Sequence, residues 1–384
     1  MKKADRVTLT ACAIMLISFF IPGFVSYKTS RIANGIPVSA QQCFDQYYWL
    51  LFIWVAVFIV LAIIKKDKQL PNLITGLFAA VSMGFFILFV AQRFPYLPFE
   101  MTANSRMSFQ IGFLLVVISL YSIMVICCQY LHKGWQKALI TLVACALVIF
   151  FLCNGWLDNY SVMQEFRANE NQFWGNAADH FMISFWVLIA AVVTGLPLGY
   201  LCCRHRILDN VTLVGLSITE TIPTLALFAV IRIPFAWLSN TFPALREIGF
   251  GSFGVAPAAT ALYLYALYLV IHNVRAAFST IDPQLLENGY AMGMTSRTVF
   301  FKVQLPQAMP VIFTGIRIAF ISTLVAATLA SYIGAGGLGT YIVNGINSLS
   351  IDMQLLGVIP IFFMTVAADA ILRVCEKVLI PHRG

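Results

Sequence analysis

The sequence predicts an all-α integral membrane protein with about ten transmembrane helices. Three observations support this fold class: 60% of the 384 residues are hydrophobic, 10% are charged, and the mean hydropathy is +0.86. A soluble domain carries roughly a quarter of charged residues, so most of this chain must face lipid or other helices. The composition therefore excludes a soluble cytosolic enzyme.

The predicted helices follow apolar stretches long enough to cross a bilayer, which takes about 20 residues. Charge-free stretches of this kind occupy residues 7–27, 46–64, 69–92, 107–131, 138–157, 181–203 and 248–274. Further apolar runs lie at about 211–233, 308–333 and 353–375, and they contain the charged residues Glu220, Arg317 and Asp369. We predict a membrane span at each of these positions.

The first stretch has a second interpretation. Residues 1–26 combine a basic start with an apolar run, as a signal peptide does, but no A-x-A-like cleavage site follows Phe20. We interpret the stretch as a retained first helix, because this keeps the alternation of basic and non-basic loops consistent along the chain.

The net charge of +8 would also fit a nucleic-acid partner, so the position of the charges matters. If the N-terminus is cytoplasmic, the inside loops hold Lys2, Lys3, Arg6, Lys65, Lys66, Lys68, Lys133, Lys137, Arg204, Arg206, Arg275, Arg297, Lys302, Arg373, Lys377 and Arg383. The outside loops hold only Lys28, Arg31, Arg93, Arg106, Arg167 and Arg246. Because basic loops resist translocation, the pattern predicts that both termini are cytoplasmic and that nucleic acid is not a partner.

The sequence contains none of the patterns that carry catalysis, metal binding or nucleotide binding. The nine cysteines include no C-x-x-C pair and no histidine partner at ligand spacing, so neither a metal site nor a disulfide scaffold is expected. No G-x-x-x-x-G-K-(S/T) loop occurs that could hold ATP phosphates, and no Ser/His/Asp arrangement or H-E-x-x-H occurs. We therefore predict no catalytic residues, no cofactor bound by this chain, and a separate source of energy.

The chain is expected to divide at a polar segment. Residues 154–180 carry Asp158, Glu165, Glu170 and Asp179 against a single basic Arg167, which indicates an external connector. Residues 1–153 form an N-terminal extension of five predicted helices without a charge inside the membrane. Residues 181–384 contain the buried charges and the longest inside loop, so this part is expected to carry the function.

The longest inside loop, residues 279–306, predicts two short helices. Asp282 followed by Pro283 is a favourable N-cap and first-turn pair. A stripe of apolar residues follows at Leu285, Leu286, Tyr290 and Met294. Gly293 permits a break between the two helices.

The second helix is expected to begin after Thr295, to carry Val299, Phe300 and Val303, and to end at Pro306. Two amphipathic helices without a core of their own need a partner surface. The alternative is that they lie on lipid headgroups.

This loop resembles a known family. Glu287, Gly293, Val303, Leu305 and Pro306 fit the spacing E-x5-G-x9-(I/V)-x-L-P, which is similar to the "EAA" loop in permease subunits of binding-protein-dependent ABC importers. The loop departs from that family at Asn288 and Gly289, where two alanines would follow the glutamate, and this departure is expected to loosen the first helix. From here on, residues 279–306 are named the coupling loop.

The resemblance covers about residues 175–375. Residues 219–231 and 333–345 are similar to segments of permeases for glycine betaine, choline, carnitine and related osmoprotectants, and the first five spans resemble the longer Yeh-type permeases. The resemblance implies a type I importer core with an N-terminal extension, in the inner membrane of a bacterium. It also implies two cytoplasmic ATPases that bind ATP, a periplasmic substrate-binding protein, and a second copy or a related permease.

A translocation pathway is expected at the predicted seventh span. Pro223 removes the hydrogen bond to the carbonyl of Thr219 and should kink the helix, and such kinks often hold substrate contacts in transporters. The candidate pathway residues are Thr219, Glu220, Thr221, Pro223, Thr224 and Arg317. We hypothesise that Glu220 and Arg317, at similar depth, neutralise one another. The alternative is that Arg317 bonds backbone carbonyls while Glu220 is protonated or faces water.

Four glycines are expected to form an outer turn: Gly334, Gly336, Gly337 and Gly339. Three of them spell G-x-G-x-x-G, but a dinucleotide site needs a preceding strand, and here a membrane span precedes the motif. We interpret the segment as a tight turn in which glycine lets backbones approach closely.

The predicted function is the permease subunit of an ATP-driven osmoprotectant importer. A permease for amino acids or another small polar solute is an alternative within the class. An ion-coupled secondary transporter would predict repeats between the two halves, and none is visible. A membrane receptor or scaffold would leave the coupling loop without a purpose.

Overall fold

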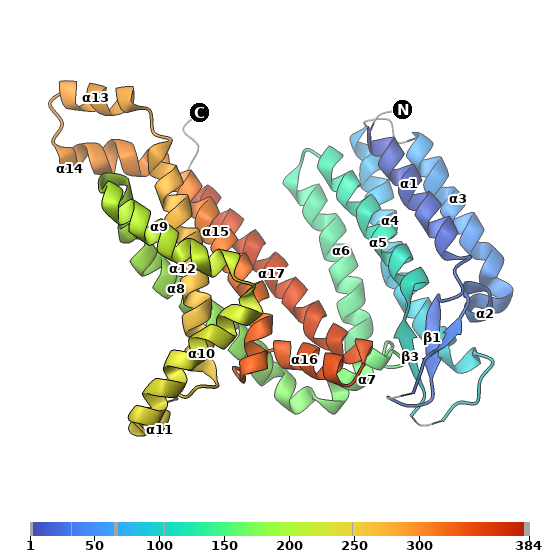
Figure 1. The fold of residues 1–384 in the computed structure, drawn as a ribbon. Helices are drawn as coiled ribbons and strands as arrows, with labels where there is room; N and C mark the ends of the chain where they lie inside the picture. Colours follow the sequence, from blue (N-terminus) through green and yellow to red (C-terminus); the bar gives the residue numbers. More distant parts are fainter. Residues whose placement is uncertain (1–2, 32, 65–67, 103, 248, 380–384) are drawn as a thin grey trace. The chain divides into compact units, whose positions relative to one another are not determined.

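The computed structural model describes residues 3–31, 33–64, 68–102, 104–247 and 249–379 (Figure 1). The topology prediction used Lys2, Lys65, Lys66 and Arg383, which lie outside the described residues. The chain divides into two compact units. Unit 1 comprises Met1–Ala168 together with Ser348–Asp352, and unit 2 comprises Asn169–Asn347 together with Met353–Gly384.

The described residues contain nine helices that are long and apolar enough to cross a membrane. This number agrees with the predicted fold of about ten spans, and two of the predicted spans differ in extent. The first helix, α1 (Lys3–Ser18), is shorter than a span. The predicted span at 211–233 is broken into α9 (Arg206–Thr221) and α10 (Thr224–Thr241), and only α10 qualifies.

The break between α9 and α10 has a local cause. Ile222 and Pro223 adopt extended conformations, with ψ angles of 128° and 132°. Proline disfavours the helical conformation of the preceding residue and lacks a backbone N–H. A new helix then starts, and its first hydrogen bond runs from the backbone N–H of Leu227 to the carbonyl of Pro223 at 3.0 Å. The kink expected at Pro223 is therefore a complete interruption.

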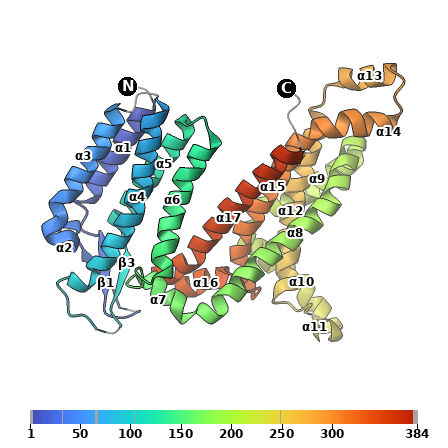
Figure 2. The same ribbon diagram turned by 180° about the vertical axis from the view of Figure 1, so that it is seen from behind.

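Unit 1 is a bundle of helices next to a small sheet (Figure 2). Its elements are α1, β1 (Val25–Lys28), β2 (Ile36–Val38), α2 (Ala40–Phe44), α3 (Tyr48–Ile64), α4 (Gln69–Arg93), β3 (Arg106–Phe109), α5 (Ile111–Tyr130), α6 (Gly134–Cys153) and α7 (Ser161–Ala168). The long helices α1, α3, α4, α5 and α6 lie side by side around an apolar core. Gly76 of α4 illustrates this packing, because Ile140 of α6 and Cys127 of α5 occupy the space that a side chain there would need.

The sheet of unit 1 was not predicted from the sequence. It is three-stranded and antiparallel, with the order β2-β1-β3, and it places Ser26 opposite Pro37 on one side and Ser108 on the other. Its strands are at most four residues long. Two of them overlap apolar runs that we interpreted as the ends of helices, because short apolar runs do not distinguish strand from helix.

Unit 2 contains the remaining helices. They are α8 (Glu170–Arg204), α9, α10, α11 (Ala244–Glu247), α12 (Val255–Ser279), α13 (Pro283–Ala291), α14 (Ser296–Val299), α15 (Leu305–Ala330), α16 (Gly339–Asn347) and α17 (Ile351–Leu379). The core forms where α8, α12 and α15 pack together. Gly195 and Gly199 of α8 lie directly against Val270 and Val274 of α12, so small residues permit the close approach.

The predicted connector at 154–180 has regular structure. It contains α7 and the N-terminal part of α8, and the division between the units falls inside it, after Ala168.

Candidate functional site

The coupling loop begins with a capped helix. The Asp282 side chain accepts a hydrogen bond from the backbone N–H of Gln284 at 2.9 Å, and Pro283 occupies the first turn of α13. This is the helix start that the sequence predicts. Gly293 follows the end of α13 with a φ angle of 80°, a left-handed conformation that favours glycine.

The second helix of the loop does not end where we predicted. The Thr295 hydroxyl accepts from the backbone N–H of Thr298 at 3.4 Å and caps α14. α14 then continues through a π-helical turn at Phe300–Gln304 directly into α15.

The prediction that Pro306 ends this helix is wrong for a physical reason. Pro306 lacks the N–H that the carbonyl of Lys302 would need in an α-helix. In the wider turn before it, the backbone N–H of Leu305 bonds to the carbonyl of Phe300, so the helical backbone reaches Pro306 without a break. Proline is tolerated in the first turn of a helix, and the coupling loop is thus continuous with a membrane span.

Gly289 lies at the contact between α13 and α14. A side chain there would meet Val299 Cγ2 at 3.3 Å and Met294 Sδ at 3.8 Å. Val299 is fully buried. Gly289 therefore lies where the two helices of the loop pack together, and the expectation that it loosens the first helix stays a prediction.

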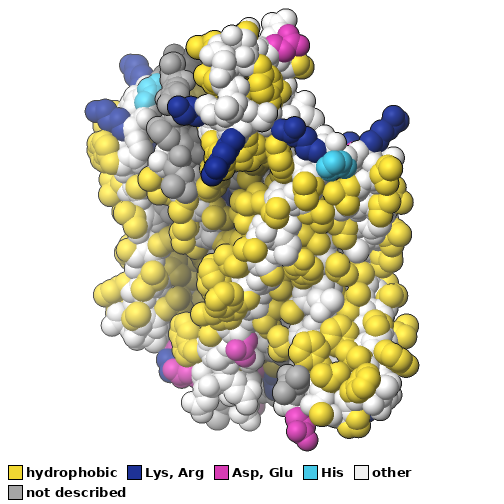
Figure 3. Space-filling view, turned by 90° about the vertical axis from the view of Figure 1, so that its left-hand side faces the viewer, with side chains coloured by type: hydrophobic (Ala, Val, Ile, Leu, Met, Phe, Trp, Pro, Cys, Tyr) yellow, Lys and Arg dark blue, Asp and Glu magenta, His cyan; other side chains and the backbone are white. Residues whose placement is uncertain are grey.

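The coupling loop exposes several large apolar side chains among its polar ones. Leu285, Tyr290, Met292 and Phe301 are exposed by 43%, 46%, 76% and 55%. The space-filling view in Figure 3 shows that hydrophobic side chains cover most of this face, with few charged side chains among them. Exposed apolar side chains next to charged ones mark a surface for a partner.

All candidate pathway residues except Arg317 lie around the break between α9 and α10. The Thr219 hydroxyl donates to the carbonyl of Leu216 at 2.6 Å, and the Thr221 hydroxyl donates to the carbonyl of Ile218 at 3.1 Å. Both hydroxyls therefore have hydrogen-bond acceptors within α9. Thr224 begins α10.

Glu220 and Arg317 lie in different surroundings. The Glu220 side chain is exposed. Arg317 lies on α15, with its Nη1 atom 3.3 Å from Glu376 Oε2 and its Nε atom 3.6 Å from Asp369 Oδ1, both on α17. Within the described part of the chain, no ion pair joins Glu220 to Arg317. Asp369 and Glu376 are spaced so that they lie on one face of a helix. This spacing was the signal in the sequence that could have indicated their pairing with Arg317.

The four glycines form a turn between α15 and α16. Gly334, Gly336 and Gly337 have φ angles of 78°, 76° and 79°. The carbonyl of Gly336 accepts from the Ser331 hydroxyl at 2.7 Å. Gly339 starts α16 against the carbonyl of Thr328. No strand precedes this turn, because all strands of the described residues belong to unit 1.

Unit 2 also has an open apolar groove of about 420 Å³ between α8 and α12. Its lining residues are Met182, Ile183, Trp186, Val187, Ala190, Val255, Ala259, Thr260 and Tyr263. Among the described residues, no group of three or more His, Cys, Asp or Glu side chains could hold a metal ion.

Comparisons with known proteins match both parts of the chain. Residues 195–382 match the family described as the inner membrane component of binding-protein-dependent transport systems. Residues 5–163 match the N-terminal domain of the ABC transporter permease YehY.

Three curated relatives resemble the C-terminal part. The osmoprotectant import permease protein OsmW of Salmonella typhimurium is 36% identical over 50% of this chain and 84% of its own length. The carnitine transport permease protein OpuCB of Listeria monocytogenes is 33% identical over 58% of this chain and 94% of its own. The glycine betaine/carnitine/choline permease protein OpuCD of Bacillus subtilis is 33% identical over 53% and 82%.

Among solved structures, the chain is similar to an amino acid ABC transporter with histidines, with a TM-score of 0.46 and 18% identity over 56% of this chain and 97% of that one. The identity to OsmW extends over most of that permease, and a family match covers the coupling loop and the helices around it. The chain therefore belongs to the inner membrane components of binding-protein-dependent transport systems.

Proposed function

We propose that this chain forms the translocation path of an ATP-driven importer for small quaternary ammonium compounds and zwitterions of the glycine betaine type. The observation that carries the proposal is the coupling loop: two capped helices with exposed apolar side chains, continuous through the turn at Phe300–Gln304 with the membrane helix α15. The cargo class is supported by the relatives, whose names refer to osmoprotectants, carnitine, choline and glycine betaine.

The energy comes from two cytoplasmic ATPase subunits that bind ATP, and this chain binds no cofactor of its own. Each ATPase contacts one coupling loop through the exposed apolar side chains of Leu285, Tyr290 and Met292. When the ATPases close, they move the loop and α15 with it. The permease then needs only two arrangements of its helices, each with different contacts to its partners.

The chain lies in the inner membrane of a bacterium with both termini in the cytoplasm, and a second copy or a related permease completes the path. The excess of Lys and Arg in the predicted inside loops, which include Arg275, Arg297 and Lys302, supports this orientation. A periplasmic binding protein delivers the cargo at the opposite end.

The test is a tagged pull-down of the full chain from its native membrane, followed by reconstitution of the purified assembly in liposomes. We expect co-purified ATPase and binding proteins, with ATP hydrolysis stimulated by glycine betaine, carnitine or choline. Stimulation by histidine or methionine alone would support the amino acid alternative. Uptake driven by an ion gradient without ATP would contradict the proposal.

A further inference from the structure

A short segment from the C-terminal part of the sequence belongs to unit 1. Ser348–Asp352 runs from the end of α16 into the first turn of α17. In this segment an apolar side chain is exposed and polar side chains are buried, the reverse of the usual pattern. Leu349 is 90% exposed, whereas Ser350 is 3% and Asp352 is 2% exposed. Leu349 also has a φ angle of 52°, a left-handed conformation that leucine disfavours and that persists where the surroundings impose it. The segment is therefore held by its polar residues.

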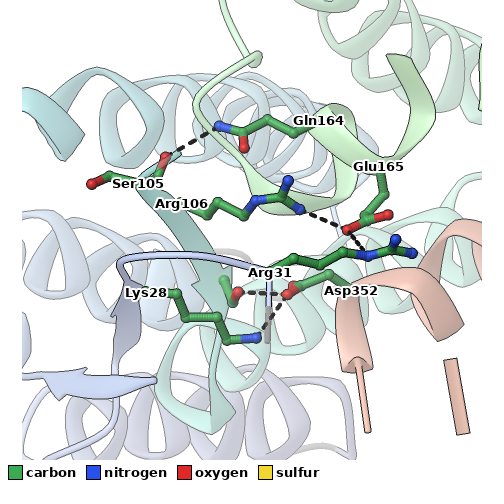
Figure 4. A network of polar contacts seen from close by, with 8 residues as sticks. Lys28, Arg31, Ser105, Arg106, Gln164, Glu165 and Asp352 are labelled. Carbon is green, nitrogen blue, oxygen red and sulfur yellow. Dashed lines mark hydrogen bonds and ion pairs between the residues drawn. The ribbon is translucent and has the colours of Figure 1, made fainter. Parts of the chain in front are cut away.

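The buried carboxylate of Asp352 is held by two strands of unit 1. Its Oδ2 atom accepts from Lys28 Nζ at 2.9 Å and from the Ser108 hydroxyl at 2.7 Å (Figure 4). Lys28 ends β1 and Ser108 lies in β3, and these strands pair directly. Asp352 also lies in the first turn of α17, where the helix dipole favours a negative charge. We name Lys28, Ser108 and Asp352 the Asp352 clamp.

A second buried carboxylate holds β3, the strand that carries Ser108 of the clamp. Glu165 of α7 is 1% exposed, and its Oε1 atom accepts from Arg106 Nη1 at 2.6 Å and lies 3.0 Å from Arg31 Nε (Figure 4). Arg106 is the residue of β3 that pairs with Lys28 of β1. The two carboxylates thus tie α7, β1, β3 and the start of α17 into one network.

The helix that begins at the clamp continues into the permease part. α17 starts at Ile351, leaves unit 1 after Asp352, and carries Asp369 and Glu376 further along. Those two carboxylates hold Arg317 of α15, the helix that is continuous with the coupling loop. The helix α17 therefore carries Asp352 of the clamp at its start. Further along, it carries the two carboxylates that contact α15, the helix that the ATPases would move.

We propose that the N-terminal unit restrains the switching of the permease by holding the start of α17 through the Asp352 clamp. A helix held at one end resists displacement along the rest of its length, so the clamp favours one arrangement until ATP and cargo act together. A purely structural ion pair would stabilise the fold without affecting the coupling between cargo and ATP hydrolysis. The inference rests on the proposed function, because its main readout is ATP hydrolysis by the assembled importer.

The experiment is a double-mutant cycle in the full chain, purified with its ATPase and reconstituted in nanodiscs. The variants are Asp352→Asn, Lys28→Met and the two together. Ser108→Ala is a milder variant that removes one hydrogen bond to the carboxylate and no charged group. The matched control is Arg167→Met, because Arg167 forms an exposed ion pair with Asp158 in the same unit and is not one of the clamp residues.

We expect basal ATP hydrolysis without cargo to rise about threefold to tenfold in each single clamp variant, with weaker stimulation by glycine betaine. The double variant should resemble the single ones, because both substitutions remove the same restraint. Ser108→Ala should shift basal hydrolysis in the same direction by less, and Arg167→Met should match the unmodified chain. Hydrogen exchange of residues 345–356 should accelerate in the clamp variants alone.

The inference is overturned if exchange accelerates while basal hydrolysis and stimulation stay unchanged, since the clamp would then be only structural. It is also overturned if Lys28→Met and Asp352→Asn have additive effects, or if Arg167→Met has the same effect as they do. An unmodified assembly that shows no ATP hydrolysis stimulated by any solute tested would instead contradict the proposed function.

Discussion

Arg317 of α15 is bound to Glu376 of α17, with 3.3 Å between Nη1 and Oε2, and both side chains are mostly shielded from water at 21% and 27% exposure. Removing one partner of a shielded ion pair leaves the other charge without compensation. We therefore predict that Arg317→Gln lowers the free energy of unfolding by about 1.5 to 3 kcal/mol, the range for a hydrogen bond to a charged group. Thermal unfolding of the full chain in detergent measures this.

The control for that prediction is Arg373→Gln. Arg373 pairs with Asp369 at 2.8 Å but is 62% exposed, so its loss should change stability by less than about 0.5 kcal/mol. Equal losses for Arg317→Gln and Arg373→Gln would contradict the pairing of α15 with α17.

The packing of Gly289 on Val299 makes a second prediction. A leucine at Gly289 must displace Val299, since even a Cβ atom would come within 3.3 Å of it. We expect Gly289→Leu to separate α13 from α14 and to reduce co-purified ATPase severalfold. Adding Val299→Ala should restore part of the binding, because it frees space at the same contact. Gly175→Leu is the control, since no atom lies within 4 Å of its Cβ position.

Much of the membrane architecture could be predicted from the sequence, because hydropathy and loop charge report directly on what lipid excludes. The start of α13 could be predicted as well, since Asp282 and Pro283 act locally on their own helix end. Local signals of this kind do not depend on where the rest of the chain lies.

The parts that could not be predicted depend on distant residues. Arg317 was expected to pair with Glu220 because both have similar depth, but depth does not say which helix a side chain faces. Lys28 and Asp352 are far apart in the sequence, and neither alone indicates the other. The interpretation of Pro306 failed because the sequence does not show that a π turn carries the helix into the first turn of α15.

Gly293 provides a third prediction, through backbone conformation. Its φ angle of 80° is disfavoured for residues with a side chain, so Gly293→Ala should destabilise the turn between α13 and α14 by about 1 to 2 kcal/mol. Hydrogen exchange of residues 285–300 should accelerate, and ATP hydrolysis should respond less to cargo. Gly215→Ala in α9 is the control, because its helical position has open space. If Gly215→Ala reduced the response of ATP hydrolysis to cargo and Gly293→Ala did not, the result would contradict the role of the turn.

Pro223 makes the last prediction, which concerns the candidate pathway. Replacing it with alanine restores a backbone N–H and removes the restriction on Ile222, so α9 and α10 can join into one helix. A continuous helix would remove the exposed turn next to Glu220, and we expect Pro223→Ala to lower the rate of glycine betaine uptake by about tenfold or more. Uptake into liposomes that contain the assembled importer measures this.

Pro234→Ala is the matched control, because Pro234 lies inside α10 without breaking it. It should leave uptake within about twofold of the unmodified chain, since the helix already continues past that position. If Pro223→Ala keeps full uptake while hydrogen exchange shows a continuous helix, then the break has no part in translocation. If Pro234→Ala lowers uptake equally, the effect belongs to α10 as a whole, and the pathway assignment at residues 219–224 is wrong.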